Sequence, residues 1–209
     1  MSPKISYISS AVDPLCVLPP RPALPRSSCT TTRLSRPGSL APSFTALDLS
    51  DFDRTMAVNL RSVIAGIKHA ARVMIPQQSG CILCTASLTG VMGGMAPHDY
   101  SISKAAVIGA VRSAAAEMGR HGIRINCISP HAIATPMGVD AMRKLAPELG
   151  EEEAVEVLEG CGELKGEVPR REDVGGRGVV LRRSETAKFV SGHNFVVDGG
   201  FTAFKRLKI

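Results

Sequence analysis

Residues 80–104 read GCILCTASLTGVMGGMAPHDYSISK, and this stretch decides the fold class of the chain. It begins with a short apolar run, residues 81–86, which follows a glycine and is typical of a strand buried on both faces. A glycine-rich loop over residues 90–97 leads into a helix that we predict from about Asp99 to Met118. A buried strand joined to a helix is the repeating unit of α/β proteins.

The flanking segments repeat this alternation of helix and strand. From Ser50, which we expect to cap the first turn, apolar residues recur at helical period from Phe52 to Met74. Two further strands are predicted at residues 123–128 and 192–197. Because such alternation forms parallel sheets, we expect an α/β fold with a three-layer, Rossmann-like parallel sheet. Three strands leave one edge bare, so we expect the sheet to be incomplete, with its first strands missing.

Residues 1–44 differ in composition from the rest of the chain. They are rich in proline, serine and threonine, and Asp13 is their single acidic residue. Such a segment buries too little apolar surface to offset the entropy of ordering, so we interpret it as a disordered leader outside a catalytic domain of residues 45–209. Two origins stay open. It is an unrelated or mis-joined leader in a cytoplasmic protein, or an organelle transit peptide, for which an arginine-rich and acid-poor composition is typical.

The net charge of +6 is concentrated at the two ends of the chain. Residues 1–44 carry +4 and residues 205–209 carry +3, which leaves −1 for the body between them. A nucleic-acid-binding face requires clustered basic residues on the folded body, so we expect no nucleic-acid partner. No apolar stretch approaches the ~20 residues of a membrane-spanning helix. We therefore expect no membrane partner either.

The cysteines show no spacing typical of a metal site or of a disulfide framework. Cys81 and Cys84 form a Cys-x-x-Cys pair, but both lie in the predicted strand. Residues three apart on a strand point to opposite faces and cannot bind one metal ion. We therefore expect buried, reduced thiols and no metal.

Tyr100 and Lys104 are four residues apart near the start of a predicted helix, so their side chains leave the same face. A neighbouring ammonium group favours the tyrosinate and lowers the pKa of the phenol, which makes it a usable acid/base. Ser87 closes the preceding strand, at the edge of a parallel sheet where ligands bind. Asn59 lies mid-helix, where an amide is unfavourable without a partner. The alternatives stay open: Tyr100 and Lys104 as a solvated pair, and Asn59 as an exposed residue.

With these residues in order, the sequence resembles the short-chain dehydrogenase/reductase family from about Leu47 to Thr202. It is most similar to plant secondary-alcohol dehydrogenases of the xanthoxin dehydrogenase type. The segments that carry the resemblance are FDRTMAVN at residues 52–59, TAS at 85–87, YSISK at 100–104, GIRIN at 122–126 and SGHNFVVDGG at 191–200.

The resemblance implies roles for particular residues. Tyr100 would be the general acid/base, Lys104 would lower its pKa and bind the nicotinamide ribose, and Ser87 would orient the substrate oxygen. Asn59 would hold a water that relays protons to Lys104. The loop residues that would lie against the nicotinamide are Pro130, Ile133 and Thr135. The reaction would be hydride transfer between NAD or NADP and a small-molecule secondary alcohol or ketone.

The sequence also departs from the family pattern. Family members begin with a strand and a Thr-Gly-x-x-x-Gly-x-Gly turn whose amides bind the cofactor phosphates, and this turn does not occur here. We therefore expect an N-terminally truncated member with impaired cofactor binding, and the choice between NAD and NADP stays open.

Three hypotheses follow for the activity of the chain. It is an active oxidoreductase, an inactive homologue that associates with full-length family members, or a fragment that does not fold stably. The resemblance implies a homo-oligomer or association with a related subunit, because the helices that carry Asn59 and Tyr100 commonly pair in the family.

Overall fold

The computed structural model describes residues 16–18, 26–29, 43–182 and 187–204. Its strands are β1 (Cys16–Leu18), β2 (Arg26–Cys29), β3 (Gly80–Thr85), β4 (Ile123–Pro130) and β5 (Asn194–Val197). Its α-helices are α1 (Leu49–Met56), α2 (Ser62–Met74), α3 (His98–Gly119), α4 (Pro136–Leu145), α5 (Glu151–Gly160) and α6 (Arg171–Arg182). Short helical turns are η1 (Phe44–Ala46), η2 (Ala57–Arg61), η3 (Ile75–Gln77) and η4 (Leu88–Gly90).

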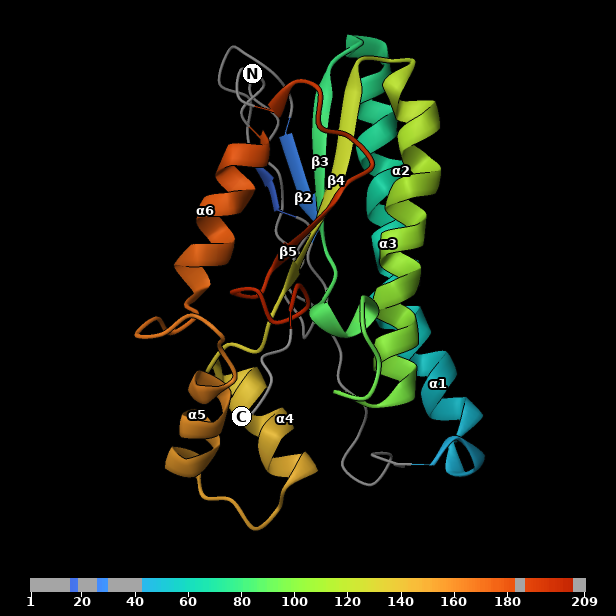
Figure 1. The fold of residues 1–209 in the computed structure, drawn as a ribbon. Helices are drawn as coiled ribbons and strands as arrows, with labels where there is room; N and C mark the ends of the chain where they lie inside the picture. The colour runs from blue at the N-terminus through green and yellow to red at the C-terminus, as the bar shows by residue number, and fades with distance from the viewer. Residues whose placement is uncertain (1–15, 19–25, 30–42, 183–186, 205–209) are drawn as a thin grey trace.

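The five strands form one sheet in the order β1-β2-β3-β4-β5. Strands β2 to β5 run parallel to one another, and β1 pairs antiparallel with β2. The best-defined pairing aligns Gly80 with Ile123 and Thr85 with Ile128. All parallel strands therefore end at the same edge of the sheet, which lies at the bottom of Figure 1. The predicted α/β class and parallel sheet are confirmed.

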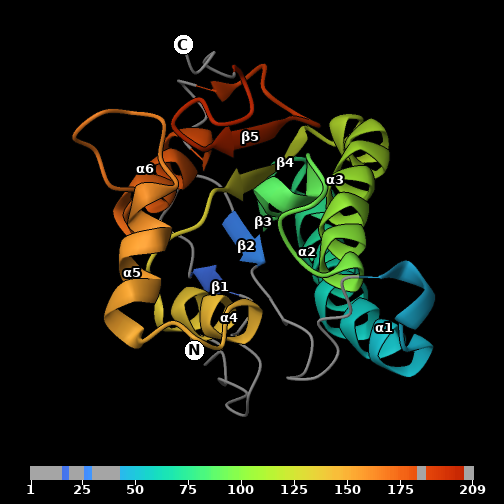
Figure 2. The same cartoon turned by 60° about the horizontal axis from the view of Figure 1, so that its bottom comes forward.

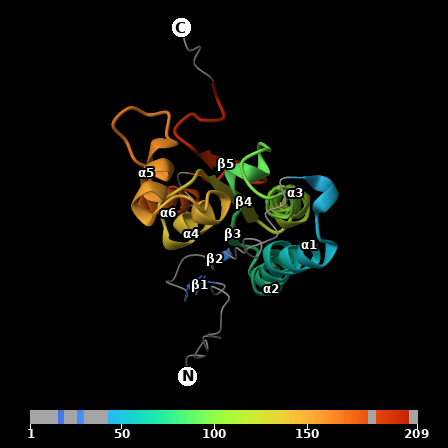
Figure 3. The same ribbon diagram turned by 90° about the horizontal axis from the view of Figure 1, so that it is seen from below.

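Helices cover both faces of this sheet, so the fold has three layers (Figures 1 and 3). On one face α2 and α3 pack against β3 and β4, because every second strand residue is apolar and points to that side. The residues at the centre of this core that are fully buried are Val63, Val107, Val111 and Ile125. On the other face, Leu83 and Ile128 pack with Val174 of α6. Figure 2 shows α4 and α5 beside the carboxyl edge of the sheet.

The helix predicted from Phe52 to Met74 is interrupted. A π-helical turn over residues 57–61 separates α1 from α2 and contains Asn59. Periodicity does not reveal such a turn, because it averages the apolar positions over several turns. Wide turns of this kind are frequent at functional sites.

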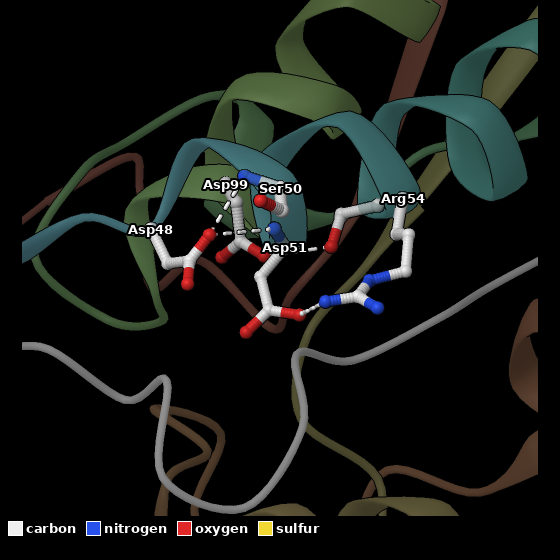
Figure 4. A network of polar contacts seen from close by, with 6 residues as sticks. Asp48, Ser50, Asp51, Arg54 and Asp99 are labelled. Carbon is white, nitrogen blue, oxygen red and sulfur yellow. Dashed lines mark hydrogen bonds and ion pairs between the residues drawn. The ribbon is translucent and has the colours of Figure 1, made fainter.

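The predicted cap at Ser50 is wrong. Asp48 is the N-cap, and its Oδ1 accepts hydrogen bonds from the amides of Ser50 (2.7 Å) and Asp51 (3.2 Å), as Figure 4 shows. These hydrogen bonds hold the pKa of the Asp48 carboxyl below its ordinary value.

The edge of β3 that was predicted to be bare is paired with β2. Strands β1 and β2 come from the segment interpreted as a disordered leader, so seven of its residues belong to the sheet. Residues 1–15, 19–25 and 30–42 lie outside the described residues, and the interpretation of the leader stays a prediction there.

The predicted burial is confirmed for Cys81 and Cys84 of β3 and for Cys127, whereas Cys161 is partly exposed. None of these four cysteines forms a disulfide among the described residues. Among the described residues, no helix combines the length and the apolarity that crossing a membrane requires.

Candidate active site

A cavity of about 280 Å³ lies at the carboxyl edge of the sheet, where β3 and β4 end. Its walls come from η4, from the loop before α3, from the loop after β4, and from α4 and α5. Most of them are apolar; the lining residues include Leu88, Pro97, Met142, Leu145 and Leu158. This is the edge at which ligands bind in open α/β sheets.

The cavity brings together five of the seven predicted site residues, namely Ser87, Tyr100, Pro130, Ile133 and Thr135. They come from three segments that are well separated in the sequence. The two remaining predicted residues, Asn59 and Lys104, are fully buried and do not line the cavity. A surface pair of Tyr100 and Lys104, and an exposed Asn59, are therefore excluded.

Ser87 is the N-cap of η4, where the polypeptide leaves β3. Its Oγ accepts hydrogen bonds from the Thr89 amide (3.3 Å) and from Thr89 Oγ1 (3.1 Å). The Ser87 hydroxyl also lowers the pKa of the Tyr100 phenol. Both residues line the same cavity.

The pKa of Tyr100 is raised above its ordinary value because burial disfavours the charged tyrosinate. The Ser87 hydroxyl acts in the opposite direction but does not cancel the effect of burial. This direction is opposite to the one predicted from the Tyr100–Lys104 spacing. The physical reason is that the phenol is only 8% exposed, which the sequence spacing does not show.

This direction leads to a spectroscopic prediction. The sequence contains two tyrosines, Tyr7 and Tyr100, and no tryptophan, so a Tyr7→Phe variant isolates the absorbance of Tyr100. We expect its tyrosinate band to appear only above pH ~10, the ordinary phenol value. For oxidation of an alcohol, the tyrosinate is the base. The value of kcat/KM, which reports the ionisation of the free enzyme, should therefore rise with pH over the same range. Titration below pH ~10 without cofactor would contradict this reading.

Lys104 is a fully buried lysine on α3. Its Nζ donates a hydrogen bond to the carbonyl oxygen of Thr85 (3.2 Å) and lies 5.6 Å from the centre of the Tyr100 ring. Thr85 lines the cavity, so the ammonium group lies directly behind the wall that carries Ser87 and Tyr100. A buried ammonium carries a large desolvation cost, which points to a role other than stability.

Asn59 is held in η2 by a partner on α3. Its Nδ2 donates a hydrogen bond to Ser103 Oγ (3.0 Å), and Ser103 Oγ donates in turn to the carbonyl oxygen of Tyr100 (2.7 Å). Asn59 is thus linked to the helix that carries Tyr100 and Lys104. The water relay to Lys104 that the resemblance implies stays a prediction.

The loop after β4 forms another part of the cavity wall. Thr135 Oγ1 caps α4 by accepting a hydrogen bond from the Gly138 amide (3.1 Å), which fixes the turn that carries Ile133. Met137, at the start of α4, lines the cavity beside it.

Sequence reasoning missed Thr55, Asp99 and His131. Asp99 and Thr55 are buried partners, and His131 lines the cavity at 6% exposure. Thr55 precedes Asn59 by four residues and Asp99 precedes Ser103 by four, but these spacings do not show that the two segments meet. Nothing comparable in the sequence marks His131.

Close backbone approach at Gly90 leads to a second prediction. A Cβ at Gly90 would lie 2.7 Å from the Ala105 nitrogen and from the Lys104 carbonyl carbon, so η4 packs directly on the backbone of α3. We expect Gly90→Ala to lower the free energy of unfolding by about 1–3 kcal/mol, because backbone atoms cannot move aside singly. Gly93→Ala is the matched control, since a Cβ there meets nothing within 4 Å. Equal melting temperatures for the two variants in thermal unfolding would refute the close approach.

The residues at the site fit the nicotinamide and ribose half of a dinucleotide. Tyr100 and Thr135 supply hydroxyl groups, the buried Lys104 supplies a positive charge, and Pro130 and Ile133 supply an apolar wall. The set contains donors and a flat apolar surface, as that half of the cofactor requires.

Comparison with known proteins agrees with the fold. Residues 34–202 match the family model described as enoyl-(acyl carrier protein) reductase. The chain therefore belongs to the short-chain dehydrogenase/reductase family.

Two plant relatives and one solved structure show how close the similarity is. Secoisolariciresinol dehydrogenase of Forsythia intermedia is 46% identical over 153 residues, which cover 73% of this chain and 53% of that protein. Xanthoxin dehydrogenase of Arabidopsis thaliana is 41% identical over 169 residues, which cover 79% and 58%. The crystal structure of levodione reductase superposes with a TM-score of 0.73 at 28% identity, covering 86% of this chain and 66% of that one. The chain thus spans little more than half the length of the plant relatives.

Proposed function

We propose that this chain is an oxidoreductase that transfers a hydride between NAD or NADP and a small-molecule secondary alcohol or ketone. The observation that carries the proposal is that Ser87 and Tyr100 both line a largely apolar cavity, with the Lys104 ammonium behind its wall. The dehydrogenase and reductase names of the matched proteins support it and give no support to the alternative of an inactive homologue.

Each residue has a part in this mechanism. The nicotinamide, when bound, supplies or accepts the hydride. Ser87 orients the substrate oxygen, and Tyr100 gives or takes the proton at that oxygen as the carbonyl is reduced or the alcohol oxidised. Lys104 places a positive charge near the phenol and so stabilises the tyrosinate when it forms. Asn59 holds α3 in place through Ser103.

The loop after β4 completes the proposed site. Pro130, Ile133 and Thr135 would form the surface on which the nicotinamide lies, and they line the same cavity as Ser87 and Tyr100. The few polar groups in the cavity wall favour a compact, largely apolar substrate.

Three further points belong to this proposal. Impaired cofactor affinity follows from the absence of the Thr-Gly-x-x-x-Gly-x-Gly turn, because amides at such a turn bind the phosphates. Association with a second copy or a related subunit is proposed through the helices that carry Asn59 and Tyr100. A cytoplasmic location is proposed, and an organelle is the alternative if residues 1–44 are a transit peptide.

The test measures cofactor reduction and binding together. Purified protein is incubated with NAD or NADP and with secoisolariciresinol or xanthoxin, the compounds that name the two plant relatives, and in the reverse direction with reduced cofactor and levodione. We expect a change in reduced-cofactor absorbance in at least one pairing, and its loss in Tyr100→Phe. Absence of turnover in every pairing, together with no thermal shift by either cofactor, would overturn the proposal.

A further inference from the structure

Two buried hydrogen bonds join the helix that ends in η2 to the helix that carries Tyr100. Thr55 Oγ1 donates to Asp99 Oδ2 (2.7 Å), and one turn further on Asn59 Nδ2 donates to Ser103 Oγ (3.0 Å). Both pairs bridge segments 44 residues apart, and the members of each helix are four residues apart. They therefore form two successive rungs on facing sides of α1–η2 and α3.

We call the Thr55–Asp99 pair the outer rung and the Asn59–Ser103 pair the inner rung. The outer rung contains a carboxyl group that is almost excluded from solvent. Asp99 is 2% exposed and Thr55 is 1% exposed. The ion pair of Arg54 and Asp51 (2.6 Å) lies on the same helix as Thr55, and its arginine side chain is 45% exposed; Figure 4 shows this ion pair together with Asp99. A buried polar group is costly unless it is hydrogen-bonded, whereas an exposed ion pair contributes little. The Thr55–Asp99 contact is therefore the one that constrains the helices.

Asp99 lies next to a residue of the candidate site, so the constraint on the helices also acts on that residue. Asp99 lies in the first turn of α3 and immediately precedes Tyr100. The N-cap of α3, Pro97, makes no side-chain capping hydrogen bond, so the first turn has no local anchor of that kind. The inner rung reaches the same residue, because Ser103 Oγ donates to the carbonyl oxygen of Tyr100.

We propose that Thr55 and Asp99 are positioning residues for Tyr100: their buried hydrogen bond sets the first turn of α3 so that the phenol meets the Ser87 hydroxyl. The carboxylate acts through Tyr100 and does not itself line the cavity. The inference rests on the proposed function for its effect on rate, but its effect on geometry is measurable without cofactor or substrate.

The geometric test uses the tyrosinate titration in the Tyr7→Phe background. Thr55→Val removes the donor at nearly constant volume, and Thr55→Ser keeps it. In the parent protein the Ser87 hydroxyl lowers the pKa of the Tyr100 phenol. If the Thr55–Asp99 pair positions Tyr100, Thr55→Val moves the phenol away from Ser87, this effect is lost, and the titration moves to higher pH. Thr55→Ser should titrate as the parent does. A stabilising role alone would lower the melting temperature without moving the titration.

The kinetic test measures kcat and KM separately on the same variants. We expect Thr55→Val to lower kcat by about tenfold to a hundredfold, as for a small misplacement of a catalytic group, while KM for the cofactor stays unchanged. Asp99→Asn retains an acceptor for Thr55 and should keep most of the rate. Arg54→Ala, which breaks only the exposed pair beside Thr55, is the matched control and should behave as the parent.

Three further outcomes also test whether Thr55 and Asp99 position Tyr100. If Thr55→Val does not fold, the double variant Thr55→Val/Asp99→Leu replaces both partners by apolar groups, which restores stability, and should still show the shifted titration. An unchanged titration and an unchanged kcat in a folded Thr55→Val protein overturn the inference. Absence of turnover in the parent refutes the proposed function alone, since the titration still tests the position of Tyr100.

Discussion

Tyr100→Phe is expected to lower kcat by about 10²–10⁴-fold, because it removes the group that exchanges a proton with the substrate oxygen. The phenylalanine ring should stay in place, because the residue at this position is only 8% exposed. The loss of one hydroxyl group should change the free energy of unfolding by only about 1 kcal/mol. A large kinetic effect with almost no effect on stability is the pattern that separates a chemical role from a packing role.

Steady-state kinetics with the best cofactor and substrate pairing measure the effect, with thermal unfolding on the same samples. Tyr7→Phe is the control, since it makes the same chemical change at the other tyrosine of the chain. We expect KM to change little, because the phenol acts on the reacting oxygen and contributes little to binding the rest of the substrate. A Tyr100→Phe protein with a kcat close to that of the parent would remove Tyr100 from the mechanism.

The elements closest to the cavity were the most predictable from the sequence. The apolar run of β3 and the small-residue helix α3 lie within one residue or two of their predicted limits. Their sequence patterns are clear because both elements are packed in the fold along their length. Successive residues of β3 and one face of α3 must therefore be apolar or small. Ser87 and Tyr100 lie near the ends of these two elements. Pro130, Ile133 and Thr135 lie at the end of β4 and in the loop after it, and they were implied by the family resemblance.

What the sequence could not show depends on contacts between distant segments. The Thr55–Asp99 and Asn59–Ser103 hydrogen bonds each join residues 44 positions apart. The direction of the Tyr100 pKa depends on how completely the surrounding chain excludes water. Strand β2 was missed for a different reason, because RSSC at residues 26–29 has no apolar run or alternation typical of a parallel strand.

Lys104→Met is expected to leave the free energy of unfolding unchanged or higher while it lowers the activity. Methionine fills a similar volume without the charge, so it avoids the cost of holding an ammonium group at 0% exposure. The hydrogen bond to the Thr85 carbonyl is lost, which offsets about 1 kcal/mol of that gain. We therefore expect the free energy of unfolding to stay within about 1 kcal/mol of the parent or to increase, as when buried charges elsewhere are replaced by apolar groups.

The same substitution should lower kcat/KM by about 10²–10³-fold, the usual effect of removing one electrostatic group that acts on charge developed in the transition state. The Lys104 ammonium lies 5.6 Å from the centre of the Tyr100 ring. Without it, this position supplies no positive charge to stabilise the tyrosinate. Lys68→Met on the exposed face of α2 makes the same chemical change away from the site and should leave both quantities unaltered. Denaturant unfolding and steady-state kinetics measure the two effects. A variant that is both less stable and fully active would show that Lys104 is kept for the fold, whereas a stable and inactive one shows that its burial serves Tyr100.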